Sequence, residues 1–152
     1  MEREQFILSV QKLNVGPITL SQPSEVKPEF INCCYGHNFS VLIEGETYQI
    51  NLSYFGKEMV SPAFLISSFL RPPLSEEACN GNLSKLQKWW KEEKPSESQF
   101  AIFLTKRKQL VFGATHSIEN LEEDSIKKLF LEMLDYLPKV AEEVNKIFPS
   151  NP

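Results

Sequence analysis

Apolar residues in the last part of the chain follow a helical period. From Asn120 to Phe148, at about 100° per residue, they fall within an arc of roughly 140° on one side of a helix. The stripe consists of Ile126, Leu129, Phe130, Met133, Leu134, Leu137, Val140, Ala141, Val144, Ile147 and Phe148. This pattern predicts one long amphipathic helix with Leu134 and Leu137 near the middle of its apolar face. Such a helix needs a surface to cover, because packing rather than intrinsic propensity stabilises most protein helices.

The start and the middle of this helix carry further signals. Asn120 is expected to cap the first turn, and Glu123, three residues later, would complete a capping box. Pro138 is expected to kink the helix rather than end it, because the apolar stripe keeps its phase across the proline.

Upstream the apolar period changes to two, which is typical of β-strands. Before a turn at residues 44–46, the apolar residues alternate at Phe39, Val41 and Ile43. After the turn, one face of the next strand carries Tyr48, Ile50, Leu52 and Tyr54. The other face of that strand carries Thr47, Gln49, Asn51 and Ser53. This alternation predicts antiparallel strands with one buried face. Ala63 to Leu70 reads as a third strand, with a short helix opened by Pro62 as the alternative.

The remaining segments complete a helix-and-sheet pattern. Gln5 to Leu13 is a short helix or a strand, with helix the preferred interpretation, and Ser21 to Pro28 and Ser75 to Gly81 read as loops. Asn82 to Lys94 predicts a helix whose apolar stripe centres nearer Trp90 than Trp89, so we expect Trp90 to be the more buried. Gln99 to Ala114 predicts a hairpin in which Gly113 offers a bend or a close packing point.

These elements indicate an α+β fold: an antiparallel sheet, made of a meander and a hairpin, packed by helices that include a long C-terminal one. A chain of 152 residues is sized for a single domain, residues 1–152, with a hydrophobic core of its own. Hydrophobic content of 41% and charged content of 24% are close to globular averages.

Composition also bears on compartment and partners. Apolar runs are too short to cross a bilayer, and the polar start Met1 to Glu4 does not resemble a signal peptide, so a cytoplasmic protein is expected. Three cysteines, an odd number, suit a reducing compartment better than a disulfide framework. A net charge of -4 and a pI near 5.3 give no reason to expect nucleic acid or an anionic membrane as a partner.

The order of elements resembles a known family. A helix over Asn82 to Lys94, a hairpin over Gln99 to Ala114 and a long helix that starts Leu-Glu-Glu-Asp-Ser-Ile follow a meander that ends at Phe64 to Leu70. This arrangement resembles the YbjN-like proteins of the superfamily with the type III secretion chaperone-like fold, although the hairpin turn is basic where that family usually has an acidic, glycine-containing one. The resemblance implies helices on an antiparallel sheet, often a homodimer, and a protein-binding role. It implies no catalytic residues.

Candidate reactive residues lie near the start of the meander. Cys33, Cys34 and His37 suggest a metal site that Cys79 and His116 could complete. Neighbouring residues in a strand point to opposite faces, however, so Cys33 and Cys34 would not readily bind one ion. A cysteine nucleophile would need a placed base and an orienting group, which spacing alone does not indicate. We therefore expect no metal, no cofactor and no catalytic residue, and interpret the cysteines as packing residues.

Two features of the second half of the chain are candidate binding elements. Lys106, Arg107 and Lys108, with lysines of the neighbouring helix, could contact phosphates beside stacked aromatic rings, but a soluble hairpin tip is the simpler interpretation in an acidic protein. Trp89 is the stronger candidate anchor for a protein partner, because adjacent helical residues point in different directions and an exposed tryptophan is a frequent binding anchor.

The sequence therefore favours a non-enzymatic protein-binding module, chaperone-like or regulatory, whose partner is another polypeptide. The alternative is a small enzyme or ligand-binding domain with a pocket between the sheet and the helices. A deep cavity gathering polar residues such as His37, His116 and Asn51 would favour the alternative. A filled seam between sheet and helices, together with an exposed apolar patch, would favour binding.

Overall fold

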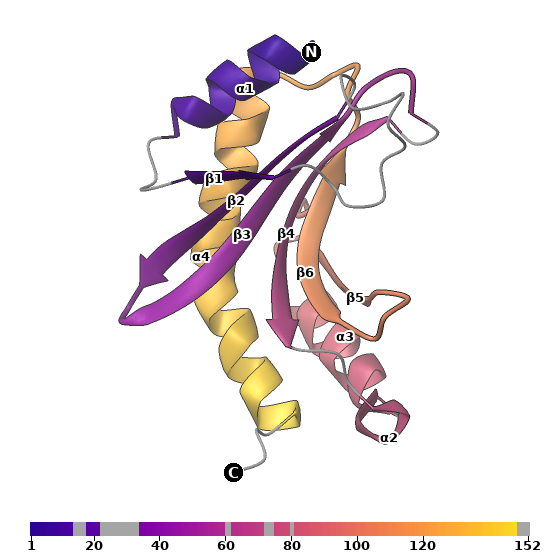
Figure 1. Ribbon diagram of the computed structural model, residues 1–152. Coiled ribbons are helices and arrows are strands. Elements are labelled where there is room, and N and C mark those ends of the chain that lie inside the picture. The colour runs from indigo at the N-terminus through magenta and orange to yellow at the C-terminus, as the bar shows by residue number, and fades with distance from the viewer. Residues whose placement is uncertain (14–17, 22–33, 60–61, 72–74, 80, 149–152) are drawn as a thin grey trace.

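The protein is an α+β domain in which one long helix lies behind a curved antiparallel sheet (Figure 1). The computed structural model describes residues 1–13, 18–21, 34–59, 62–71, 75–79 and 81–148. Its helices are α1 (Arg3–Gln11), α2 (Glu76–Cys79), α3 (Asn82–Glu93) and α4 (Glu123–Ile147). Its strands are β1 (Ile18–Ser21), β2 (Cys34–Ile43), β3 (Glu46–Phe55), β4 (Ala63–Arg71), β5 (Ala101–Leu104) and β6 (Leu110–His116).

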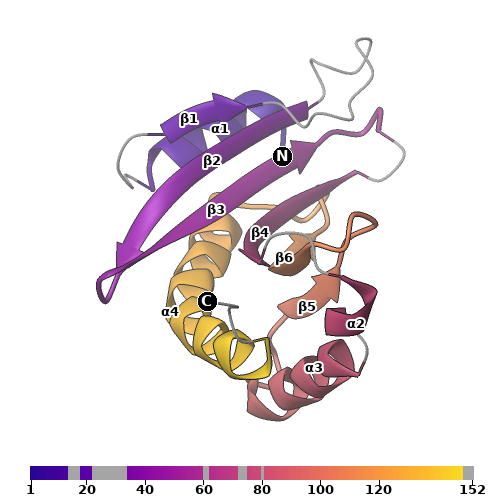
Figure 2. The ribbon, with the colours of Figure 1, turned by 60° about the horizontal axis from the view of Figure 1, so that its bottom comes forward.

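The six strands form one sheet in the order β1-β2-β3-β4-β6-β5, with every neighbouring pair antiparallel. Glu44 and Gly45 both have positive φ, which suits the two-residue turn that closes β2 onto β3. Pairing of β3 with β4 extends only from Asn51 to Phe55 on the β3 side. Figure 2 shows the closed end of the β2–β3 hairpin separating from β4 beyond this pairing.

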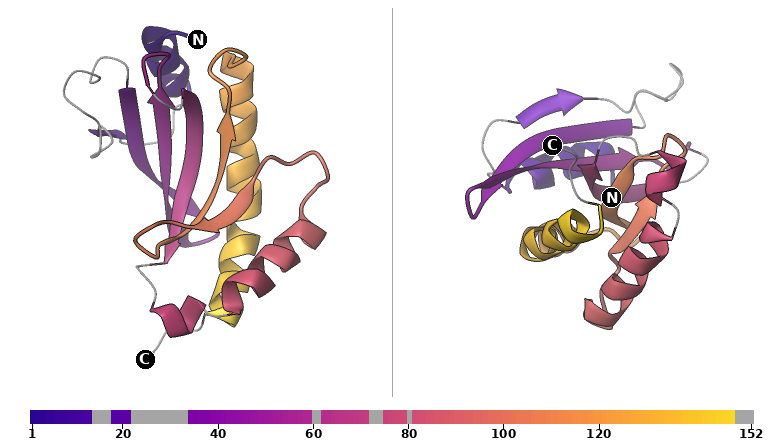
Figure 3. Two further views of the ribbon diagram at one scale, coloured as in Figure 1. Left: turned by 90° about the vertical axis from the view of Figure 1, so that its right-hand side faces the viewer. Right: turned by 90° about the horizontal axis from the view of Figure 1, so that it is seen from below.

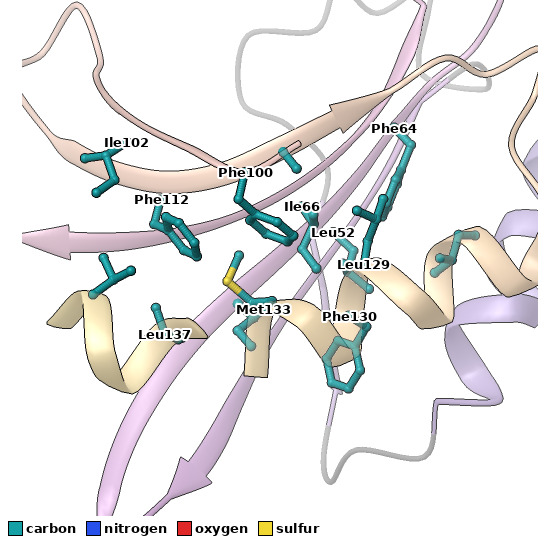
Figure 4. Packing of buried hydrophobic residues seen from close by; sticks show 14 of the residues in the cluster. Leu52, Phe64, Ile66, Phe100, Ile102, Phe112, Leu129, Phe130, Met133 and Leu137 are labelled. Atoms are coloured by element: carbon teal, nitrogen blue, oxygen red, sulfur yellow. The ribbon is translucent and has the colours of Figure 1, made fainter. Parts of the chain in front are cut away.

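Helices α1, α3 and α4 all pack on the same face of the sheet (Figure 3). Their apolar sides join the inward side chains of the strands in one core, and Figure 4 shows Met133 and Leu137 of α4 pointing toward this sheet face. Fully buried members include Phe6, Ile50, Leu52, Phe64, Ile66, Leu86, Phe112, Ile126, Met133, Leu137 and Val140. The seam between helices and sheet is thus filled by apolar side chains.

The N-terminal helix is held at the top of this core by packing and by its first residues. Phe6 is fully buried and its ring lies 5.2 Å from that of Tyr54 and 5.5 Å from that of Phe64, centroid to centroid. The Tyr54 hydroxyl donates a hydrogen bond to the Met1 carbonyl at 2.8 Å, and the Met1 ammonium donates one to the Ile118 carbonyl at 3.1 Å. These contacts join α1 to the sheet and to the segment that leads into α4.

Most elements agree with the sequence-based predictions. The segment from Gln5 is helical, Ala63 to Leu70 is a strand, and both the Trp-containing helix and the hairpin form where expected. Helix α4 continues through Pro138, as the unbroken stripe predicted. Gly113 is a close packing point, because a Cβ built there would lie 2.5 Å from the Ile66 carbonyl oxygen of β4.

Other predictions need correction. Helix α4 begins at Glu123 rather than at Asn120, and its N-cap residue, Glu122, makes no side-chain capping bond, so the predicted capping box is wrong. Residues 118–121 instead form a turn in which the Leu121 N–H donates to the Ile118 carbonyl. Leu134 is only partly buried, at the edge of the stripe, whereas Leu137 is fully buried.

Two short elements were not expected from the sequence. The predicted loop Ser75 to Gly81 contains the single-turn helix α2, and the four-residue strand β1 ends at Ser21, where a loop was predicted to begin. Residues 22–28 of that predicted loop lie outside the described residues. In the part of the chain that the structure describes, no helix is long and apolar enough to span a membrane.

Candidate functional site

The face of the sheet that points away from α1, α3 and α4 is not covered by a described helix (Figure 3). Strand alternation and register define which residues of β2 to β6 point to this side, which we call the open face. They are Cys34, Gly36, Asn38, Ser40, Leu42, Thr47, Gln49, Asn51, Ser53, Phe55, Ala63, Leu65, Ser67, Phe69, Ala101, Phe103, Val111, Gly113 and Thr115.

None of the open-face residues named above is charged, although 24% of the chain is charged. The charged residues of the six strands are Glu46 and Arg71, each at the end of its strand; Glu46 pairs with Ile43 on the other face, and the side chain of Arg71 lies outside the described part of the structure. Exposed faces of soluble sheets normally carry charged side chains, which keep them in water and oppose aggregation. The absence of charge therefore sets this face apart from the helical side of the molecule.

Three apolar side chains lie in a row on β4, β6 and β5, at the β5 side of the open face. Phe69 of β4 pairs in register with Val111 of β6, and Val111 pairs with Phe103 of β5 on its other side. Phe69 is 47% exposed and Phe103 is 37% exposed, while Val111 is almost fully buried between these two register partners. We call Phe69, Val111 and Phe103 the apolar row. It places two large aromatic side chains in solvent on adjacent parts of a rigid sheet.

The sheet edge next to the apolar row is covered by α3. The Trp90 Nε1–H donates to the Phe100 carbonyl at 2.8 Å, and the Gln87 side-chain amide donates to the Ile102 carbonyl at 3.0 Å. These carbonyls are acceptors that an incoming strand would use, so α3 protects the β5 edge. The indole of Trp90 also packs edge-on against Phe112, with 5.1 Å between ring centroids.

Trp89 and Trp90 differ as the helical phase predicted. Trp90 is buried, at 5% exposure, and Trp89 is partly buried against the same core, with 6.2 Å between the two ring centroids. Trp89 therefore keeps some exposed surface on the helical side of the molecule, while the exposed phenylalanines lie on the open face. Its role as a binding anchor stays a prediction.

The basic residues of the hairpin lie at its tip. Lys106, Arg107 and Lys108 are all exposed, and Lys108 has a positive φ of 63° in the turn between β5 and β6. The Thr105 side chain accepts a hydrogen bond from the Gln109 N–H at 3.1 Å and closes this turn. The three basic side chains are thus exposed to solvent at the end of a hairpin, and their role in binding remains a prediction.

His37 is buried on the helix-covered side of β2. Its Nε2 is hydrogen-bonded to the Tyr35 hydroxyl, and its buried Nδ1 has no partner among the described residues. Burial lowers the pKa of His37 below its ordinary value, because the charged imidazolium is disfavoured away from water. Burial also raises the pKa of Tyr35, an effect that the Arg3 guanidinium, 5.5 Å from the Tyr35 ring centroid, partly opposes.

The described members of the candidate metal site, Cys34, His37 and His116, do not converge. Cys34 pairs with Phe55 on the open face, whereas His37 pairs with Leu52 on the helix-covered face. Among the described residues, no three His, Cys, Asp or Glu side chains are grouped as metal ligands. Cys33 and the side chain of Cys79 lie outside the described part of the structure. Burial raises the pKa of the Cys34 thiol, which disfavours the reactive thiolate.

The polar residues that would line a pocket under the alternative hypothesis, His37, His116 and Asn51, do not gather at one place. Asn51 is on the open face and His37 on the opposite face, while His116 is at the end of β6. His116 lines a hollow of about 150 Å³ together with Glu97, Glu132 and four other residues. Pockets for small ligands usually measure roughly 300 to 1,000 Å³. A wider depression of about 590 Å³ follows the outer side of α4 around the exposed Leu131 and is lined mainly by charged residues.

Comparison with known protein sequences found no match. The sequence matches no protein-family model and no curated protein. Function is therefore inferred from the geometry and chemistry of the open face.

Proposed function

We propose that this chain is a non-enzymatic protein-binding module, chaperone-like or regulatory, that works in the cytosol and binds a polypeptide partner through the open face. The observation that carries the proposal is the apolar row on a sheet face without charged residues. Depletion of charge and enrichment of aromatic side chains are the compositional features of protein–protein interface centres.

The energy available at the apolar row is large enough to matter for binding. Covering the exposed parts of Phe69 and Phe103 would remove on the order of 170 Å² of apolar surface from water, which corresponds to about 4 kcal/mol. Both phenylalanines extend from paired strands, so little backbone order has to be gained when a partner binds. Rigid aromatic side chains of this kind are typical binding hot spots.

We further propose that the fold is of the type III secretion chaperone-like kind and that the chain is related to the YbjN-like proteins. Support comes from the succession of α3, the β5–β6 hairpin and the long α4, with the helices on one face of an antiparallel sheet. This relationship is consistent with a protein-binding role, although the role is argued from the open face.

Affinity capture with matched variants tests the proposal. Phe103→Glu places a charge in the apolar row, and Leu131→Glu places the same charge at an exposed leucine on the opposite, helical side, where 53% of the leucine is exposed. We expect the wild type and Leu131→Glu to capture the same proteins and Phe103→Glu to lose them, with all three chains equally folded by circular dichroism. Equal capture by all three would contradict binding through the open face.

A further inference from the structure

We propose that the open face binds polypeptide segments in which aromatic or aliphatic residues stand within a few positions of a cluster of Asp or Glu. The inference rests on the proposed function, because it names the chemistry of the partner for the same surface. It follows from the place of the basic tip, which is Lys106, Arg107 and Lys108, beside the apolar row.

The basic tip lies directly beyond the apolar row in the β5–β6 hairpin. Phe103 pairs with Val111, and the next pair, Leu104 with Leu110, is the last one before the turn. At about 3.3 Å per residue, the basic residues begin roughly 7 to 10 Å from Phe103 along the strand direction. An extended segment covers this distance with two or three residues, so its apolar and acidic side chains can reach both features at once.

The basic tip is a local positive charge on an acidic protein. From Ser98 to Ile118 the charged residues are Lys106, Arg107 and Lys108 alone, with histidine counted as neutral, whereas the whole chain has a net charge of -4. All three side chains are exposed, and none forms a salt bridge with a described residue. An acidic segment would therefore gain ion pairs at the tip without breaking any that the structure describes, while the net negative remainder of the chain would repel it.

The apolar row supplies the other half of the site. Phe69 and Phe103 are separated by one strand, so at about 4.8 Å per strand they extend from backbones roughly 10 Å apart. Two apolar side chains of one segment can therefore cover both rings. The apolar row provides the buried contact, and the basic tip selects, among apolar segments, those with acidic neighbours.

The β5 edge directs such a segment across the face rather than along the edge. The carbonyls of Phe100 and Ile102 already accept hydrogen bonds from Trp90 and Gln87 of α3. Because these acceptors are occupied, the segment cannot add to β5 as a further strand at these positions. Side chains of the apolar row and of the basic tip are then the groups that recognise it.

Phosphate groups are the competing ligands for a basic tip, because they also carry negative charge. Domains that bind nucleic acid usually have a pI above about 9, and membrane-binding basic segments carry roughly four to eight Lys or Arg. This chain has a pI near 5.3 and three basic residues at the tip. The charge balance therefore favours carboxylates of a polypeptide over RNA or an anionic membrane.

Selection from a random peptide display library tests the inference. The full chain is compared with Lys106→Glu/Arg107→Glu and with the control Lys127→Glu/Lys128→Glu, which reverses two exposed lysines of α4. Lys108 is kept in both variants because its φ is positive, and thermal melts check that each protein is folded. We expect the wild type and the control to enrich apolar residues with Asp or Glu within about four positions, and the tip variant to enrich apolar residues alone.

Fluorescence anisotropy with a labelled peptide selected by the wild type measures the effect on affinity. We expect the affinity to fall at least tenfold in the tip variant and to be unchanged in the control. Replacing the acidic residues of the peptide by their amides should produce a similar loss. Raising the salt concentration from about 50 mM to about 500 mM should also weaken binding, because exposed ion pairs are screened.

The outcomes separate this inference from the proposed function. Apolar peptides selected by the wild type without acidic residues, or acidic residues enriched equally by the tip variant, would overturn the inference. If Phe103→Glu still abolished selection, the proposed function would stand. Absence of any selected peptide, or selection that Phe103→Glu leaves unchanged, would contradict the proposed function.

Two phosphate probes complete the test. A single-stranded RNA and vesicles containing phosphatidylserine are expected to bind neither the wild type nor the tip variant. Binding of either probe to the wild type that is lost in Lys106→Glu/Arg107→Glu would assign the basic tip to phosphate and overturn the inference.

Discussion

Three leucines at three-residue intervals along α4 allow the packing of this helix to be tested with one kind of substitution. Leu131 is 53% exposed, Leu134 is partly buried, and Leu137 is fully buried. Each Leu→Ala change removes the same atoms and alters helix propensity by the same small amount, so differences in stability report burial alone.

The expected costs follow from the burial of each side chain. Leu137→Ala removes about 2.4 kcal/mol of transfer free energy, at about 0.8 kcal/mol per carbon group, and leaves a cavity in the core that raises the total to about 3 to 5 kcal/mol. Leu134→Ala should cost about 1 to 2 kcal/mol, because part of the side chain is already in water. Leu131→Ala should change the free energy of unfolding by less than about 0.5 kcal/mol.

Urea titrations of the three variants measure these costs directly. The slopes of the unfolding curves should agree within error, so that differences in midpoint report stability rather than changes in the unfolded state. Lys128→Ala, at an exposed position of the same helix, serves as a second control and should be nearly neutral. The assigned face of α4 would be refuted if Leu137→Ala were no more costly than Leu131→Ala.

Three further predictions concern other parts of the core. Burial lowers the pKa of His37, so below about pH 6.5 the unfolded chain takes up a proton at this imidazole more readily than the folded chain does. The free energy of unfolding should therefore fall as the pH falls below that value, by up to about 1.4 kcal/mol per pH unit. Urea titrations between pH 5 and 7 should show this slope in the wild type and His116→Gln but not in His37→Gln. Gly113→Ala should lower stability by about 1 to 3 kcal/mol in a urea titration, because its methyl group would push against the Ile66 carbonyl, and an unchanged midpoint would exclude that close approach. Trp90→Ala should lower the melting temperature considerably more than Trp89→Ala, since only Trp90 is buried and bonded to the β5 edge; equal losses in thermal melts would contradict their assigned positions.

Much of the helical side of the fold could be predicted because its signals are periodic and local. The stripe of α4 and the order of burial of Trp89 and Trp90 both follow from helical phase. The start of α4 could not be located in this way, because the turn at residues 118–121 takes the place of the expected cap at Asn120. Strand β1 could not be predicted, because four residues are too few to show the two-residue alternation of a β-strand.

The open face could be only partly predicted from the sequence. The uncharged alternation of Thr47, Gln49, Asn51 and Ser53 indicated the outward side of β3. In β4 and the β5–β6 hairpin, however, residues on both sides of the strands are apolar, so the pattern does not say whether Phe69 or its neighbours face the core. That choice depends on where three helices from distant parts of the chain pack, and such non-local contacts leave no periodic signal.

Photo-crosslinking from defined positions tests the binding role of the open face most directly. A photoreactive phenylalanine analogue would replace Phe69 in the apolar row or, as the control, Leu131 on the helical side; both residues are about half exposed. We predict that illumination of cells producing these proteins gives protein adducts from position 69 and none from position 131. Adducts from position 131 alone, or equally from both positions, would contradict a binding surface on the open face.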